Sequence, residues 1–203
     1  MVVLLALAAF WLGACPFSLW VGRWFLGKDI RDYADGNPGA ANVFRAGGRK
    51  SGFLALVLDI AKGMPLVFLA HAFFGLAEPL AMLVGICAIA GHSFSPLLRL
   101  RGGKAIAVTF GVLMALPQHE VLFTFAAFML LGFFFIENNA WIVMLGPVGS
   151  LAYLAVTGMD FWYSLFMMGV LMLLVIKHFN ELKTIPRPKV RVIAWLQSRR
   201  RVI

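Results

Sequence analysis

The segment from Lys28 to Lys50 holds the first group of residues suited to chemistry. It contains Asn37-Pro38-Gly39, which forces a tight turn, and it ends with the basic residues Arg45, Arg49 and Lys50. In turns of this kind, successive backbone N–H groups can point inward at an anion while nearby cations add charge. The pattern favours an anion site, although an ordinary glycine-rich loop explains it equally well.

A second candidate is the segment 91–104, which ends in Gly102-Gly103-Lys104 directly before an apolar run. The N-terminus of a helix attracts anions because its first N–H groups are unpaired and its dipole is positive there. A lysine behind two glycines adds charge at the same place. The segment is not a Walker A motif, because the first glycine and the Ser or Thr after Lys104 are missing. We therefore interpret it as a candidate phosphate-binding site that differs from a Walker A motif.

Ionisable residues are otherwise rare in the apolar part of the chain. Asp59 and Lys62 lie three residues apart, so they share one face of a helix, and such a pair is costly in a membrane unless it faces a polar interior. A structural ion pair and a direct substrate contact explain it equally well. Cys15 and Cys87 form no CxxC pair, so we expect neither a metal site nor a cofactor. The chemistry is therefore expected at the polar loops.

Composition identifies the elements that must position these loops. Of 203 residues, 62% are hydrophobic and 13% are charged, against roughly 25% charged in a soluble domain. This excludes a soluble globule and predicts an all-α, polytopic membrane protein. Seven transmembrane helices are expected from seven apolar runs: 1–22, 53–75, 79–91, 105–117, 121–136, 140–157 and 161–176. The third and fourth runs are short against the about 20 residues that a bilayer requires, so they must borrow flanking residues or cross a thinned region of the membrane.

The basic residues sort the loops by side. All but one of the 18 Lys and Arg residues fall in 23–52, 92–104 and the chain from Lys177 onward, which seven crossings place on one face. The positive-inside rule then puts the N-terminus outside and the C-terminus and active-site loops in the cytoplasm. This distribution also accounts for the net charge of +9, so we expect no nucleic-acid partner. Membrane lipids are the expected surroundings.

Several motifs occur in a fixed order along the first half of the chain. They are Cys15-Pro16-Phe17-Ser18, Asp29-Ile30-Arg31, the run from Gly36 to Arg45, Asp59-Ile60-Ala61-Lys62-Gly63, Gly91-His92-Ser93-Phe94 and Arg101-Gly102-Gly103-Lys104-Ala105. Together they resemble the PlsY family of bacterial glycerol-3-phosphate acyltransferases. The resemblance implies transfer of a fatty acyl group from acyl phosphate to the sn-1 hydroxyl of glycerol 3-phosphate. The products would be phosphate and lysophosphatidic acid for phospholipid synthesis in the cell membrane.

The resemblance also implies a set of site residues. Arg45 and Lys104 would clamp substrate phosphates, with His92 and Asn180 as further catalytic groups. The substrate-binding candidates are Asp35, Gly36, Asn37, Gly39, Asn42, Arg49, Gly102, Gly103 and His178. Acyl phosphate is a mixed anhydride with a good leaving group, so positioning and anion stabilisation can suffice without a metal or a covalent nucleophile.

The chain departs from the family pattern at several hydroxyl positions. The family usually carries Gly-Ser-Gly-Asn where this chain has Ala34-Asp35-Gly36-Asn37, and Ala41 replaces a threonine. Glu137-Asn138-Asn139 stands where a serine-rich segment is expected, and His178 and Asn180 lie two apart instead of three. An anion at Asp35 has the wrong sign for a phosphate site. An alternative is therefore a divergent paralogue with another acceptor or without catalysis, and a weaker alternative is a small transporter.

The expected domain organisation follows from the last apolar run. Residues 1–182 form the seven-helix acyltransferase-like domain, and 183–203 form a basic cytoplasmic tail. From Lys189 onward the tail mixes apolar residues with arginines. This composition is typical of a segment bound at an anionic lipid surface, and equally of a positive stop after the last span.

Overall fold

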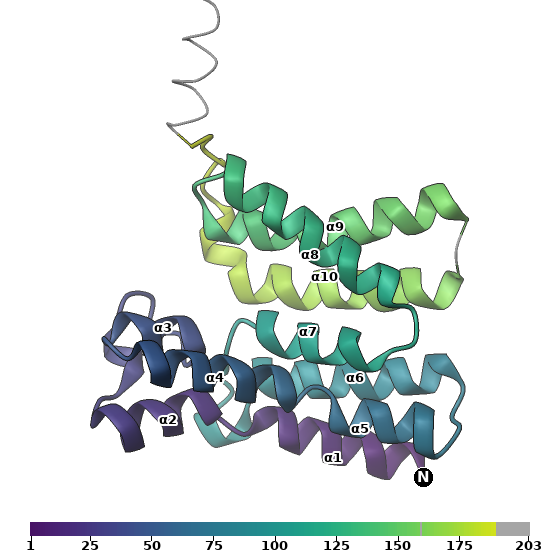
Figure 1. Cartoon of the computed structure of the whole chain (residues 1–203), viewed down its shortest axis with the longest axis horizontal. Helices are drawn as coiled ribbons and strands as arrows, with labels where there is room; N and C mark the ends of the chain where they lie inside the picture. Colours follow the sequence, from purple (N-terminus) through teal and green to yellow (C-terminus); the bar gives the residue numbers. More distant parts are fainter. Residues whose placement is uncertain (159, 190–203) are drawn as a thin grey trace, which may run out of the picture.

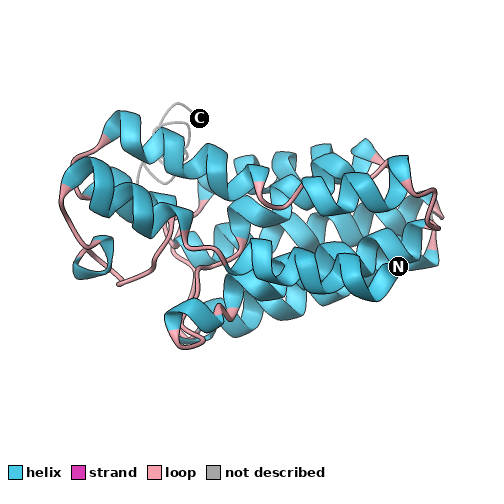
Figure 2. Cartoon of the chain, turned by 90° about the horizontal axis from the view of Figure 1, so that it is seen from below, coloured by secondary structure: helices cyan, strands magenta, loops and turns pink. Residues whose placement is uncertain are grey.

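The computed structural model describes residues 1–158 and 160–189, and these form an assembly of helices (Figure 1). Figure 2 shows the same helices and the loops between them from below. In chain order they are α1 (Val2–Ala14), α2 (Phe17–Leu26), η1 (Ile30–Asp32), α3 (Ala40–Arg45), α4 (Arg49–Ala61), α5 (Pro65–Phe68), the π-helical η2 (Leu69–Phe73), α6 (Glu78–Ser93), η3 (Pro96–Leu98), α7 (Ile106–Ala115), α8 (His119–Phe135), α9 (Asn139–Thr157) and α10 (Phe161–Leu182). Within the described part, β pairing is limited to one bridge between Ile136 and Pro188. The predicted all-α membrane fold is confirmed.

Each of the seven apolar runs forms helix, but their lengths differ. Five segments are long and apolar enough to cross a membrane: Val2–Leu26, Arg49–Phe73, Glu78–Leu98, Asn139–Thr157 and Phe161–Leu182. The third run reaches this length by borrowing flanking residues, as expected. Helix α7 has 10 residues and α8 has 17, so both are shorter than a full span. The number of seven crossings therefore stays a prediction.

The helices form two layers in Figure 1. Helices α8, α9 and α10 form the upper one, and α1 with α4 to α7 form the lower one, with α10 packed on α6 between them. Glycine permits a close contact between α1 and α6. A Cβ at Gly13 would lie 2.1 Å from Ala88 O, and a Cβ at Gly91 would lie 2.0 Å from Phe10 O. This small-residue packing fixes the end of α6 against the end of α1.

A break in the first span exposes two backbone carbonyls that anchor it to neighbouring segments. The first span bends between α1 and α2, at Cys15 and Pro16, because proline has no N–H to continue the ladder. The carbonyl of Ala14 accepts a hydrogen bond from Ser95 Oγ at 2.6 Å. The carbonyl of Cys15 accepts one from Lys62 Nζ at 2.9 Å. The bend is therefore anchored to both the α4 span and the loop after α6.

The polar connections gather at one end of the bundle, drawn at the left of Figure 1. This end holds segments 27–48 and 94–105, the turn between α8 and α9, and the C-terminal end of α10. The opposite end holds the N-terminus and the three remaining turns. The two basic loops and the C-terminal end of α10 therefore lie together, as the charge pattern indicates.

The first residues of the predicted tail pack against the turn between α8 and α9. Glu137 N–H donates to Arg187 O at 3.0 Å, and Lys189 N–H donates to Phe135 O at 3.0 Å. The expected interfacial segment from Lys189 onward lies outside the described residues except for Lys189 itself.

Candidate active site

Asn42 organises the first polar loop. It lies in the first turn of α3 and is fully buried. Its Nδ2 donates to Tyr33 O and Asn37 O, both at 2.9 Å, and lies 3.0 Å from Asp35 Oδ1. Its Oδ1 accepts from Arg45 Nη1 at 2.8 Å. The amide thus folds the loop around itself and orients the arginine that follows it.

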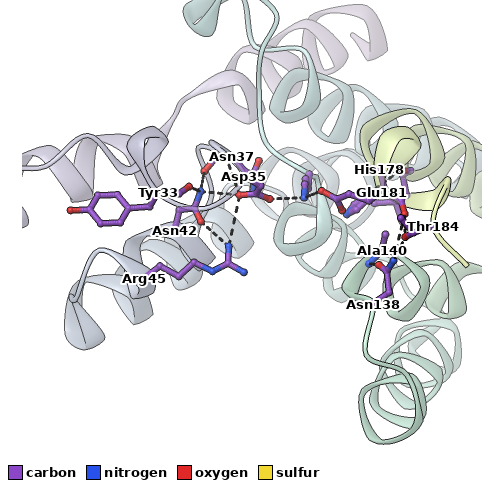
Figure 3. A network of polar contacts seen from close by, with 12 residues as sticks. Tyr33, Asp35, Asn37, Asn42, Arg45, Asn138, Ala140, His178, Glu181 and Thr184 are labelled. Carbon is purple, nitrogen blue, oxygen red and sulfur yellow. Dashed lines mark hydrogen bonds and ion pairs between the residues drawn. The ribbon is translucent and has the colours of Figure 1, made fainter. Parts of the chain in front are cut away.

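Asp35 lies between the two cations predicted to clamp phosphate (Figure 3). Its Oδ2 is 2.6 Å from Lys104 Nζ, and its Oδ1 is 3.8 Å from Arg45 Nη1. Burial alone would raise the pKa of Asp35. The hydrogen bond and charge of Lys104, with donors from Asn42 and the N–H of Asn37, outweigh burial and hold the pKa below its usual value. The carboxylate is therefore ionised at neutral pH.

Lys104 joins the two halves of the chain. Besides Asp35, its ammonium contacts the carboxylate of Glu181 at the end of α10. Burial would lower the pKa of Lys104, but hydrogen bonds to the two carboxylates raise it above its usual value. Figure 3 shows the resulting chain of contacts from Asp35 to Glu181, and the side chain that links these two carboxylates is Lys104. Lys104 thus carries a full positive charge with two anionic neighbours.

His92 and the two glycines before Lys104 pack directly on each other. His92 lies in the last turn of α6 and is 7% exposed. Gly103 N–H donates to His92 O at 3.0 Å, and a Cβ at Gly103 would lie 2.1 Å from His92 Nε2. A Cβ at Gly102 would lie 2.0 Å from His92 O. Only glycine fits at both positions, so the imidazole is held beside the backbone that carries Lys104.

A buried ion pair, Asp59 with Lys62, lies beside the bend between α1 and α2. Their side chains are 2% and 1% exposed, and Lys62 Nζ lies 2.8 Å from Asp59 Oδ1. Ser18 Oγ donates to Asp59 Oδ2 at 2.5 Å, while Lys62 holds the carbonyl of Cys15. These contacts tie α4 to the bend between α1 and α2, which favours the structural interpretation for Lys62.

Helix α10 contributes contacts that sequence reasoning did not foresee. Lys177 Nζ donates to Ser93 O at 2.8 Å and to Gly102 O at 3.0 Å, which fixes the glycine loop to α10. Glu181 contacts Lys104. Neither Lys177 nor Glu181 belongs to a recognisable motif. Their positions next to His178 and Asn180 in the sequence are what could have pointed to them.

Three other predicted site residues, His178 and Asn180 on α10 and Arg49 on α4, are not members of the ion-pair cluster around Lys104. His178 is buried, and its Nδ1 lies 2.9 Å from Leu174 O, a contact in which the ring nitrogen donates to its own helix. Asn180 is exposed, and its Oδ1 accepts from Lys183 at 3.2 Å. Arg49 is exposed at the start of α4.

A pocket of about 390 Å³ opens beside the ion-pair cluster, between α3, α4 and α7. One part is polar and includes Asn37, Gly39, Asp59, His92 and Lys104. The rest is apolar, with side chains from α4 and α7: Leu56, Ile60, Ile106, Ala107 and Phe110. A polar mouth continuous with an apolar body suits a ligand with a charged head and a hydrocarbon chain.

Comparisons with known proteins agree on one family. A model of the family described as glycerol-3-phosphate acyltransferase matches residues 3–187. The glycerol-3-phosphate acyltransferase of Lactococcus lactis subsp. lactis is 30% identical over 191 residues, 91% of this chain and 89% of the relative. That of Listeria monocytogenes serotype 4a is 32% identical over 197 residues, 96% of this chain and 98% of the relative.

A solved structure shares the fold. It is the crystal structure of PlsY (YgiH), an integral membrane glycerol 3-phosphate acyltransferase, in its glycerol 3-phosphate form. The TM-score is 0.80 with 24% sequence identity, over 90% of each chain.

Proposed function

Because the chain belongs to the glycerol-3-phosphate acyltransferase family, we propose that it moves a fatty acyl group from acyl phosphate to the sn-1 hydroxyl of glycerol 3-phosphate. The chain is a membrane-embedded acyltransferase of phospholipid synthesis. The donor, the acylated hydroxyl and the residues that perform the reaction are the proposed part. Lysophosphatidic acid and inorganic phosphate would be the products.

One observation carries the proposal for the site. Lys104 and Arg45 approach the same carboxylate, at 2.6 Å and 3.8 Å, from two segments far apart in the chain. Two cations that converge on one anionic position form a seat for a phosphate group, since both can make charge-assisted hydrogen bonds to its oxygens. In this structure the carboxylate of Asp35 takes the place of that anion. His92 and Asn37 line the adjoining pocket and offer further hydrogen bonds.

The adjoining pocket suits the acyl donor. Its apolar body between α4 and α7 would hold the hydrocarbon chain, with the carbonyl carbon at the polar mouth beside Lys104. The acceptor oxygen then attacks the carbonyl carbon, the bond from that carbon to the phosphate oxygen breaks, and the hydroxyl proton passes to the released phosphate or to water. The cations stabilise the negative charge that develops on the leaving phosphate.

The orientation in the membrane is also part of the proposal. We place the N-terminus outside, the C-terminus in the cytoplasm and seven crossings between them. The gathering of the basic loops at one end of the bundle supports this assignment. The site would then face the cytoplasm.

Asp35 favours a second candidate function. A carboxylate at the phosphate seat repels a phosphorylated acceptor and attracts a neutral or cationic one. A divergent acyltransferase that acts on glycerol or an amino alcohol would use Asp35 to bind that acceptor directly.

The test is a matrix of donors and acceptors. Purified protein is incubated with acyl phosphate or acyl-CoA, and with glycerol 3-phosphate, glycerol or an amino alcohol, while lipid product and released phosphate are measured. The proposal expects lysophosphatidic acid from acyl phosphate and glycerol 3-phosphate. Equal use of acyl-CoA would contradict the donor assignment, and preferred acylation of glycerol or the amino alcohol would select the second candidate.

A further inference from the structure

A second cavity, of about 790 Å³, opens at the same polar end of the bundle. It lies between the loop around η1 and the loop around η3, and its lining includes Arg31, Asp32, Gly36, Leu97, Arg99 and Arg101. It shares no lining residue with the apolar pocket beside Lys104. Gly36 places it next to Asp35 and Asn37, so it adjoins the candidate active site from outside.

The charges of this cavity favour an anion. Arg99 and Arg101 are exposed, and in the described part of the chain no carboxylate oxygen lies within 4.0 Å of either guanidinium. Arg31 is held by Asp29, with Nε 2.9 Å from Oδ1 and Nη2 2.6 Å from Oδ2. A guanidinium presents several N–H groups in one plane, which suits phosphate oxygens. Asp32 adds an acceptor that could bind hydroxyl groups.

The backbone that presents these arginines is strained. Arg99 and Leu100 have φ of +52° and +62°, a left-handed conformation that residues other than glycine seldom adopt. The turn persists because it is held from several sides. Leu100 N–H donates to Ser95 O at 2.9 Å, Arg101 N–H donates to Leu98 O at 3.0 Å, and Ser95 itself is bonded to Ala14. Strain that the surroundings maintain concentrates at functional loops, and here it places Arg99 and Arg101 on one cavity.

We propose that this cavity is a second phosphate site, which binds a water-soluble phosphate dianion next to the reaction centre. The inference rests on the proposed function, because that reaction takes one phosphate dianion from water and returns another. The ligand is glycerol 3-phosphate before it reaches the seat at Arg45 and Lys104, or inorganic phosphate after it leaves. The two ligands share the phosphate group that the arginines recognise, and only glycerol 3-phosphate has hydroxyls for Asp32.

Binding to a protein without the first seat tests the proposal independently of activity. The Arg45→Ala/Lys104→Ala variant is titrated calorimetrically with glycerol 3-phosphate, inorganic phosphate and glycerol at low ionic strength. We expect phosphate-dependent binding to persist and to weaken about tenfold or more when Arg99→Gln and Arg101→Gln are added, because each loses hydrogen bonds to a charged group. Tighter binding of glycerol 3-phosphate identifies the incoming acceptor, and tighter binding of phosphate identifies the leaving product.

Three results would overturn the second site. They are absence of phosphate binding in the variant without the first seat, binding that Arg99→Gln/Arg101→Gln leaves unchanged, and glycerol binding as tight as that of glycerol 3-phosphate. The affected arginines are exposed, so the substitutions should not prevent folding.

Kinetics of the otherwise unchanged enzyme separate this proposal from the proposed function. If the second cavity binds the incoming acceptor, Arg99→Gln/Arg101→Gln should raise KM for glycerol 3-phosphate about tenfold at low salt and change kcat by no more than about twofold. The rise in KM should be smaller at high salt, because salt screens the charges of the arginines. Arg187→Gln/Lys189→Gln removes two charges from the same end without touching the cavity and should leave KM unchanged. A wild-type protein that does not acylate glycerol 3-phosphate refutes the proposed function, whereas the titration decides the second site.

Discussion

Replacing Asp35 with serine removes the carboxylate that lies between Lys104 and Arg45. A phosphate that enters the seat must displace this carboxylate or share the cations with it. At an effective dielectric constant of about 20, two unit charges about 4 Å apart interact by about 4 kcal/mol. The side chains of Asp35 and Lys104 are 33% and 20% exposed, so solvent reduces the value of their pair to about 1–2 kcal/mol.

The expected result of Asp35→Ser is therefore a lower KM for glycerol 3-phosphate. If the substrate no longer has to replace an ion pair worth about 1–2 kcal/mol, its KM falls by about 5- to 30-fold, with turnover similar or higher. Steady-state acylation of glycerol 3-phosphate at saturating acyl phosphate measures it. Asp35→Asn is the matched control, because it removes the charge but keeps an oxygen for the Asn42 amide, and it should change KM in the same direction.

The pH dependence of this effect follows from the ionisation of the pair. The pKa of Asp35 lies below its usual value of 3.8 and that of Lys104 lies above its usual value of 10.5. The stabilisation from the ionised Asp35 is therefore present above about pH 4 and is lost only as pH falls through its lower folded pKa. The ratio of KM between wild type and Asp35→Ser should stay constant between about pH 7 and 8, where Asp35 is ionised and glycerol 3-phosphate, whose second pKa is about 6, is a dianion.

Two results would refute this reasoning about Asp35. If wild type prefers glycerol or an amino alcohol and Asp35→Ser shifts the preference to glycerol 3-phosphate, the carboxylate binds the acceptor. If both proteins prefer glycerol 3-phosphate and folded Asp35→Ser loses activity, the carboxylate must instead be considered as a general base for the acceptor hydroxyl.

Three further predictions concern orientation, the glycine loop and the acyl pocket. A cysteine at Glu78 should react with an impermeant reagent in intact cells and one at Arg49 should not; labelling of the latter from outside would overturn the orientation. Gly103→Ala should reduce acylation at least about 30-fold, because the new methyl would lie 2.1 Å from Nε2 of His92. Gly169→Ala, with 3.3 Å to the tip of a flexible side chain, should change the rate little. Ala107→Phe should shift the donor preference toward shorter acyl chains, and an unchanged chain-length profile would exclude this pocket as the acyl site.

Most of the helices can be predicted from the sequence, because a lipid bilayer restricts which segments can span it. A chain in a bilayer must satisfy its backbone within helices and must keep its charges at the ends, so apolar runs and basic loops define the elements. The lengths of the short spans are less readable. Helix α6 continues through Gly91, His92 and Ser93, which composition alone assigns to a loop.

The site can be predicted only in part, because the direction of each side chain depends on how its helix is rotated about its own axis. Consecutive residues on a helix point about 100° apart, so the motif around Asn180 indicates the right turn of α10 but not the side chain that meets Lys104. In the structure that side chain is Glu181, while Asn180 is exposed. Likewise, the ion-pair partner of Asp35 cannot be identified from its neighbours in the sequence, although Arg45 lies 3.8 Å away. The principal partner is Lys104, which is distant in sequence and approaches through tertiary packing.

We propose that Arg45 and Lys104 together bind one phosphate group during acyl transfer. The most direct test of this proposal is the rate of lysophosphatidic acid formation by wild type, Arg45→Ala, Lys104→Ala and the double variant, with folding checked for each. Each single substitution should cost about 2–4 kcal/mol of transition-state stabilisation, a loss of about 30- to 1,000-fold. The double variant should lose much less than the product of the two, because both cations act on the same group. Wild-type turnover in both folded single variants would contradict the proposal.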